Sequence, residues 1–144
     1  MASGAATTAA PKTGSRNRPG TRASDFFGPD NYDPQVLAID EATKETFSLT
    51  EYPDGLTSTL PGMSSSITAP VMVVNGSSDR LSCGPAYAIC ADSATLQAAE
   101  AAFFSPAARL RTFVLPGSGH SVNLARNTAQ YHAAVVDWMK SVVG

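Results

Sequence analysis

Residues 69–79 read APVMVVNGSSD, and this stretch decides the fold class. Its apolar run, residues 71–74, is unbroken and shows no alternation of polar and apolar positions. Such a run is typical of a strand that is covered on both faces, as the strands of parallel sheets are. Asn75 and Gly76 favour the end of this strand, and a polar loop then leads to Asp79.

A helix and a second strand follow this loop. Residues 95–104 favour a helix, with Asp92 or Ser93 placed to cap its N-terminus. Residues 111–115 are predicted to form the second strand, which ends at a Pro-Gly pair. The loop after that strand leads to His120.

The strongest helical pattern lies in the last part of the sequence. Asn127 and Gln130 have the spacing of a capping box, although Asn replaces the usual Ser or Thr. Six apolar residues then recur at intervals of three and four, which predicts a helix with one face in the core. They are Tyr131, Ala134, Val135, Trp138, Met139 and Val142.

Strands that alternate with helices predict an α/β fold in which two parallel strands are flanked by helices. Ligands of such sheets bind beyond the carboxyl ends of the strands. The loop after the first strand carries Asp79, and the loop after the second carries His120. We therefore expect the carboxylate and the imidazole to lie within hydrogen-bond reach, at about 2.6–3.2 Å.

The sequence divides into three parts. Residues 1–24 are rich in Ala, Thr, Gly and Arg without an apolar period, which is typical of a disordered leader. Residues 25–66 are irregular, with repeated Pro and Gly, and contain one predicted helix, residues 34–44, capped by Asp33. Residues 67–144 form the predicted α/β part.

Composition excludes several classes of protein. Of the 144 residues, 43% are hydrophobic and 15% are charged, and the net charge of -2 argues against a nucleic-acid partner. No stretch reaches the roughly 18 apolar residues of a membrane span. The apolar core of a signal peptide is also missing, which favours a cytoplasmic location. We expect no metal and no cofactor, because no matching motif is present.

The sequence contains two cysteines, Cys83 and Cys90, with a spacing that matches no zinc motif. Two alternatives stay open: small buried thiols, or a disulfide formed in an oxidising compartment. Because no export signal is visible, composition by itself favours free thiols.

Four stretches carry a resemblance to a known family: APVMVVNGSSD (69–79), FVLPGSGHSVNLARN (113–127), VVDWM (135–139) and YDPQVLAIDEATKETFSL (32–49). They resemble the C-terminal part of an α/β-hydrolase, and the last stretch is similar to fungal, esterase-like members. In this family the chain order is nucleophile, acid, histidine. The resemblance covers residues 26–144 and is strongest from residue 67 onward.

The resemblance implies that Asp79 and His120 are the acid and the histidine of a Ser-His-Asp triad. In such a triad the carboxylate fixes the tautomer of the imidazole, which takes the proton of the serine. The implied substrate is an ester, less readily an amide, of a small organic molecule. Gly117 and Gly119 suit a tight loop that presents His120.

No G-x-S-x-G motif, which carries the nucleophile in this family, occurs in the chain. The nearest string, residues 62–66 (GMSSS), lacks the second glycine. The resemblance therefore implies a hydrolase part whose serine lies outside this chain. The alternative is a non-catalytic, truncated relative that acts, if at all, through association with another chain.

The resemblance also bears on residues 25–66 and on the cysteines. Residues 25–66 are similar to the segment that leads from the cap to the acid-bearing strand, which makes them cap-derived. Secreted fungal members carry a cysteine pair in the loop after the acid. The resemblance therefore implies a Cys83–Cys90 disulfide and a secreted protein, against the reading from composition.

In a complete hydrolase, the strand of residues 71–74 has a further strand on its far side. In this chain that edge would expose unpaired N–H and C=O groups, which are a template for association. A two-stranded sheet is also marginally stable by itself. We therefore expect the chain by itself to be oligomeric through this strand edge, aggregation-prone or only partly ordered.

Overall fold

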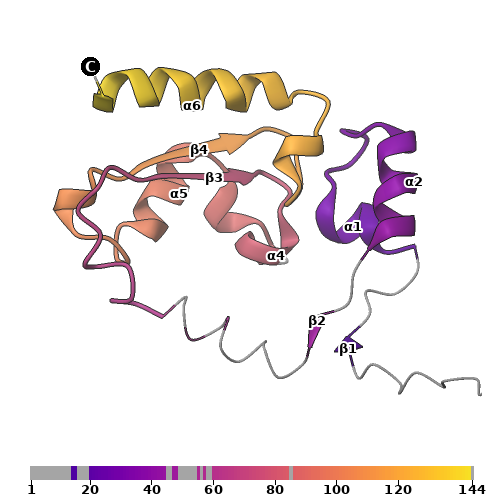
Figure 1. Cartoon of the computed structure of the whole chain (residues 1–144), viewed down its shortest axis with the longest axis horizontal. Coiled ribbons are helices and arrows are strands. Elements are labelled where there is room, and N and C mark those ends of the chain that lie inside the picture. Colours follow the sequence, from indigo (N-terminus) through magenta and orange to yellow (C-terminus); the bar gives the residue numbers. More distant parts are fainter. Residues whose placement is uncertain are drawn as a thin grey trace, which may run out of the picture.

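The centre of the computed structural model is a parallel sheet of two strands, β3 (Met72–Gly76) and β4 (Arg111–Leu115). Helices follow each strand, so the chain has the mixed α/β character predicted from the sequence (Figure 1). The structure describes residues 14–15, 20–44, 47–48, 55, 57, 60–84 and 86–143.

The two strands pair in a continuous register. Val73 lies opposite Thr112, and Asn75 lies opposite Val114, with no interruption between them. β3 includes Asn75 and Gly76, which the sequence placed after the end of the strand, because β4 still pairs with both residues.

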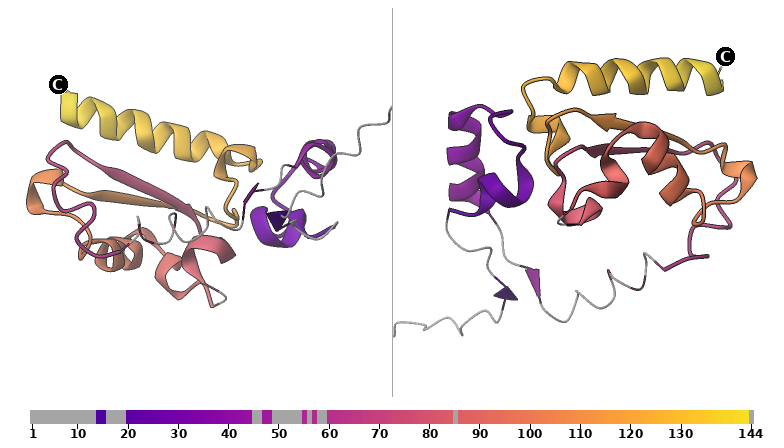
Figure 2. Two further views of the ribbon diagram at one scale, coloured as in Figure 1. Left: turned by 60° about the horizontal axis from the view of Figure 1, so that its bottom comes forward. Right: turned by 180° about the vertical axis from the view of Figure 1, so that it is seen from behind.

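Helices cover both faces of the sheet (Figure 2). One face carries α4 (Arg80–Cys83), the 3-10 turn η1 (Ala88–Cys90) and α5 (Ser93–Glu100). The other face carries α6 (Thr128–Val143). The sheet is thus the middle layer of three.

α5 is shorter than predicted at its C-terminal end. It stops at Glu100, and residues 101–104 form turns and a bend that lead toward Pro106. Its N-cap is Asp92, one of the two predicted caps, whose carboxylate accepts a hydrogen bond from Thr95 N–H at 2.7 Å. This bond satisfies a backbone donor that the first helical turn leaves without a partner.

The buried core is small. Leu96 and Cys90 are fully buried and pack with Cys83 and Val114, while Val73 packs against the edge of this cluster. Cys83 and Cys90 form a disulfide, with Cα atoms 5.7 Å apart. The prediction of free thiols from composition is therefore wrong, because α4 and η1 bring the two residues within bridging distance.

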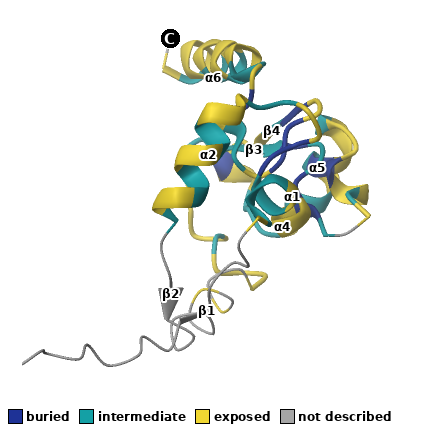
Figure 3. Cartoon of the chain, turned by 90° about the vertical axis from the view of Figure 1, so that its right-hand side faces the viewer, coloured by how far each residue is buried: buried dark blue, intermediate teal, exposed yellow. Residues whose placement is uncertain are grey.

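α6 faces the sheet with only part of its predicted apolar stripe. Figure 3 shows both intermediate and exposed residues along this helix. Trp138 and Val142 are half-buried, whereas Met139 is 49% exposed, so its assignment to the core is wrong. A sheet of two strands is too narrow to cover the full width of such a stripe. No helix in the described part of the chain is both long and apolar enough to cross a membrane.

α1 (Arg22–Phe26) and α2 (Pro34–Thr43) form a pair of helices beside the sheet. Asp33 caps α2, as predicted, by accepting a hydrogen bond from a backbone N–H of the first turn at 2.8 Å. The guanidinium of Arg22 donates to the carboxylate of Asp40 at 2.7 Å and so links the two helices.

The predicted disordered leader, residues 1–24, is ordered in part. α1 begins at Arg22, because the carbonyl of Thr21 accepts the first helical hydrogen bond at 2.9 Å. β1 (Gly14–Ser15) also lies in this range and pairs antiparallel with β2 (Phe47–Ser48). Residues 1–13 and 16–19 of the predicted leader lie outside the described residues.

Residues 26–32 pack against the loop that follows β4. The carbonyl of Phe26 accepts a hydrogen bond from Ser121 N–H at 2.8 Å. The side chain of Asn31 donates to Asn127 Oδ1 at 2.7 Å. The Asn127 amide nitrogen donates to the Pro116 carbonyl at 2.9 Å, so both polar atoms of this side chain bind other segments, and no bond of the predicted capping box is present among the described residues.

The disulfide should stabilise the fold. We expect the double variant Cys83→Ala/Cys90→Ala to unfold with a free energy about 2–3 kcal/mol lower, because the bridge closes a short loop in the unfolded chain. Urea unfolding measures this difference. Leu81→Ala, at a 54% exposed position of α4, is the control and should change stability by less than about 0.5 kcal/mol. Alkylation of two thiols without reductant would contradict the bridge.

Candidate functional site

Asp79 is placed by the end of β3 and the start of α4. It is the N-cap of α4, and its Oδ1 accepts hydrogen bonds from Leu81 N–H at 2.9 Å and Ser82 N–H at 3.0 Å. The residue is only 2% exposed. These bonds fix the carboxylate in one orientation and leave Oδ2 available for another partner.

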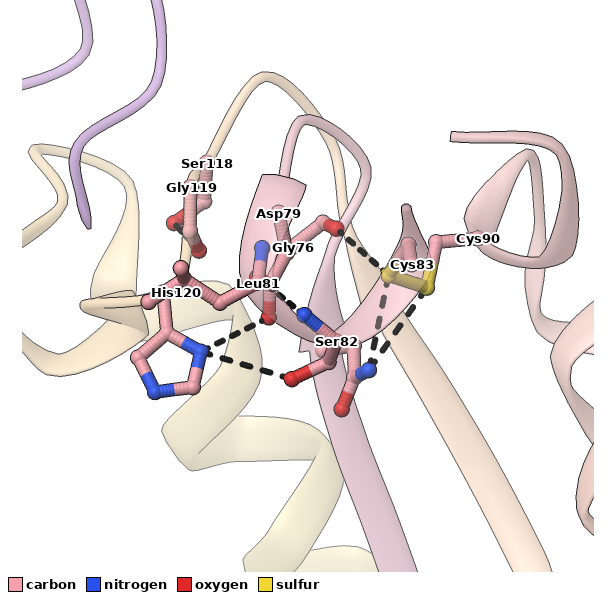
Figure 4. The surroundings of a disulfide bond; sticks show 10 residues. Gly76, Asp79, Leu81, Ser82, Cys83, Cys90, Ser118, Gly119 and His120 are labelled. Carbon is pink, nitrogen blue, oxygen red and sulfur yellow. Dashed lines mark hydrogen bonds and ion pairs between the residues drawn. A yellow bond between two sulfur atoms is a disulfide. The ribbon is translucent and has the colours of Figure 1, made fainter. Parts of the chain in front are cut away.

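His120 supplies that partner. Its Nδ1 lies 3.0 Å from Asp79 Oδ2, within the distance predicted from the sequence (Figure 4). Although 41 positions separate the two residues in the chain, the parallel pairing of β3 and β4 brings the following loops to the same edge of the sheet. The expected proximity is confirmed, and the catalytic roles stay a prediction.

The contact changes the protonation of both groups. Burial by itself would raise the pKa of Asp79, but the hydrogen bonds from His120 and Ser82 outweigh it and leave that pKa below its ordinary value. The hydrogen bond to Asp79 holds the pKa of His120 above its ordinary value, although partial burial opposes this. The pair therefore favours an anionic carboxylate beside a readily protonated imidazole.

The imidazole has one occupied and one open nitrogen. Nδ1 faces Asp79 and lies 3.4 Å from the hydroxyl of Ser82. Nε2 has no hydrogen-bond partner among the described residues, and 43% of the side chain is exposed. Phe26 contacts the ring edge-on, with centroids 5.8 Å apart. The open nitrogen is the atom that can exchange a proton with a substrate or a nucleophile.

Sequence reasoning did not single out Phe26 or Ser82 for this site. Ser82 lies three positions after Asp79, the spacing of an N-cap and its third helical residue, so the start of a helix there would have placed it near the acid. Phe26 carries no such signal, because its contact depends on how residues 26–32 pack on a distant loop.

Two glycines let the three backbone segments of the site approach closely. A Cβ at Gly76 would lie 2.2 Å from the carbonyl oxygen of Ser118, and a Cβ at Gly119 would lie 2.5 Å from the backbone of Phe27. Gly117 has a φ of 68°, which suits glycine, as expected for the tight loop before His120.

The disulfide lies at the other end of the short helix that begins at Asp79. Cys83 ends the helix that Asp79 begins, and the bridge ties it to η1. The side-chain amide of Asn75, in β3, lies 3.5 Å from each sulfur. α4, and with it the Asp79 carboxylate, is therefore attached to the sheet at both ends.

A cavity of about 340 Å³ adjoins the acid loop on the side of α1. Tyr32 and Tyr87 line it together with Ser78 and Arg80, the two neighbours of Asp79. His120 is not among its lining residues, so the cavity and the open ring nitrogen are separate features.

No protein-family model matches the chain, and no curated protein matches it. In the described part of the chain, no group of three His, Cys, Asp or Glu side chains is arranged to hold a metal ion.

Gly119→Ala should disturb the site through its backbone. The new methyl group would overlap the backbone of Phe26 and Phe27, so we expect a loss of about 1–3 kcal/mol in unfolding free energy. Gly55→Ala is the control, since a Cβ there would meet nothing within 4 Å. Urea unfolding measures both variants, and equal stabilities would contradict the close packing.

The charge of Asp79 should control the titration of His120. Asn still caps a helix, so Asp79→Asn keeps α4 and should lower the pKa of His120, as followed by NMR of the imidazole. The raised pKa means that the ion pair stabilises the fold below about pH 6.5 and loses this effect as the pH rises through the folded-state pKa.

The lowered pKa of Asp79 sets the lowest pH at which the Asp79–His120 ion pair stabilises the fold. Its contribution is present above about pH 3.9 and is lost as the pH falls. The stability difference between the wild type and Asp79→Asn should therefore be largest between these limits. A difference that grows from pH 6.5 to pH 9 would contradict this assignment.

Proposed function

We propose that the chain is the acid- and histidine-bearing part of an α/β-type serine hydrolase that cleaves an ester of a small organic molecule. The observation that carries the proposal is the 3.0 Å contact between Asp79 Oδ2 and His120 Nδ1, beside an open Nε2. An amide is a less favoured substrate, since its leaving group is poorer.

In this proposal each atom of the pair has one task. The Asp79 carboxylate holds the neutral imidazole with its proton on Nδ1, so that Nε2 carries the lone pair. Nε2 takes the proton of the attacking serine hydroxyl and later gives it to the leaving alcohol. The raised pKa of His120 suits this exchange, because the imidazolium forms beside a carboxylate.

The order and placement of the two residues support the hydrolase proposal. The acid follows one parallel strand and the histidine follows the next, at the carboxyl edge where ligands of α/β sheets bind. We also propose that residues 25–66 are a cap-derived segment, because residues 32–49 resemble the segment that follows the cap in this family. The disulfide favours folding in an oxidising compartment, and we therefore propose export.

A second candidate is a non-catalytic relative. No hydroxyl in the described part of the chain bonds to Nε2 of His120, and the sequence contains no G-x-S-x-G motif. Ser82 does not fill this role, because it contacts the nitrogen that Asp79 already occupies. In the catalytic proposal the serine and its oxyanion donors come from residues outside this chain.

The 144-residue chain should be inactive by itself. We expect no turnover of an activated ester above buffer and no labelling by a serine-directed phosphonate, because triad members act as a unit. His120→Ala is the matched control and should give the same rate. Stoichiometric labelling of one serine, mapped by mass spectrometry, would show that a nucleophile lies within the chain.

The catalytic proposal is tested on the longest polypeptide that the gene encodes in frame with this chain. If it is correct, that polypeptide contains a G-x-S-x-G serine that the phosphonate labels. Asp79→Asn should then lower kcat/KM by about 10⁴-fold. A gene that encodes no such serine would leave the non-catalytic relative as the function.

A further inference from the structure

Along β3, the backbone N–H and C=O groups of successive residues point alternately toward β4 and away from it. Arg111 N–H donates to the Val71 carbonyl, and Ser77 N–H donates to the Leu115 carbonyl, both at 3.0 Å. Because successive residues of a strand direct their peptide groups to opposite edges, Val73 and the other odd-numbered residues bond to β4. Met72 and Val74 therefore direct their N–H and C=O groups away from β4.

The outer edges of the two strands differ. On β4, Val114 N–H donates to the hydroxyl of Ser93 at 3.0 Å, and the Leu110 carbonyl accepts from the Gln97 amide at 3.1 Å. Side chains of α5 thus bind part of the outer edge of β4, whereas the N–H and C=O groups of Met72 and Val74 on the outer edge of β3 have no partner among the described residues.

The open edge carries none of the features that protect edge strands. Residues 55–78 contain no charged side chain, and the register of β3 shows no bulge. Pro70 stands before the strand and not within it. A neutral, regular edge does not repel a second copy of itself.

We propose that two copies of the chain pair antiparallel through β3, about a twofold axis at Val73. With Val73 opposite Val73 of the second copy, Met72 of each chain lies opposite Val74 of the other. In antiparallel pairing such residues exchange both of their hydrogen bonds. The N–H and C=O groups of Met72 and Val74 are all satisfied in this register, which gives a four-stranded sheet with the order β4-β3-β3-β4.

The side chains suit the same register. Val73 packs on the disulfide cluster, and the Asn75 amide contacts both sulfurs, so these two residues face α5. Met72 and Val74 therefore face α6. The twofold axis places Met72 of each copy beside Val74 of the other copy, as an apolar cross-strand pair. The C-terminal ends of the two β3 strands point in opposite directions, which keeps both His120 rings free. In a complete hydrolase a further strand would occupy this edge of β3, so the pairing agrees with the non-catalytic candidate and excludes the catalytic one.

Val74→Pro tests the pairing. It removes an N–H at the open edge and leaves the bonds of residues 71, 73 and 75 to β4 intact. Sedimentation equilibrium should show a dimer for the wild type and a dimer dissociation constant at least about tenfold weaker for Val74→Pro, because symmetry removes two of four hydrogen bonds.

Thr112→Pro is the matched control, since its N–H lies on the outer edge of β4 and has no partner among the described residues. It should keep the dissociation constant of the wild type, even though it loses the hydroxyl bond to Ser93. Equal weakening by both variants would overturn the proposal, as would a wild-type chain that is monomeric at every concentration.

Amide exchange of the wild type keeps the test independent of how the variants fold. The amides of Met72 and Val74 should be protected in the dimer and should exchange faster on dilution, whereas that of Asn75, which bonds to β4, should change less. Fast exchange of Met72 and Val74 in a sample that sediments as a dimer would place the interface elsewhere and overturn the proposal.

Discussion

The Asp79 carboxylate is the group on which the arrangement of this chain depends. One oxygen accepts two backbone N–H groups at the start of α4, and the other binds His120 from the loop after β4. A buried carboxylate without such partners would be costly, because desolvation disfavours its charge. The hydrogen bonds that keep this carboxylate anionic also hold α4, the loop after β4 and the imidazole in place. The Asp79 carboxylate therefore both caps a helix and orients His120.

This arrangement requires close packing of backbone segments. Gly76 and Gly119 allow the loop before His120 to lie against β3 on one side and against residues 26–32 on the other. The N-terminal helices are thus part of the site, since Phe26 contacts the imidazole and its carbonyl binds Ser121. Phe26, which is far from His120 in the sequence, thereby restricts the imidazole ring that Asp79 orients.

The sheet explains both the disulfide and the open edge. Two strands bury few large side chains, and a small core gains from a bridge that constrains the unfolded chain. The Cys83–Cys90 bridge and α5 complete one side of the sheet, where Ser93 and Gln97 satisfy β4. The other side ends at Met72 and Val74 without partners among the described residues.

The sequence by itself determined the two central strands, α2, α5, α6 and the acid–histidine pair, because an unbroken apolar run, cap residues and turn residues are local signals. It placed Asp79 and His120 correctly, since parallel strands bring the loops at their carboxyl ends together. It did not determine the state of the cysteines or the exposure of Met139, which depend on how elements distant in the chain pack. Only the tertiary structure decided that Phe26 contacts the imidazole and that β1 and the first residues of α1 lie within the predicted leader, residues 1–24. Those features arise from contacts between distant segments, which leave no periodic pattern in the sequence.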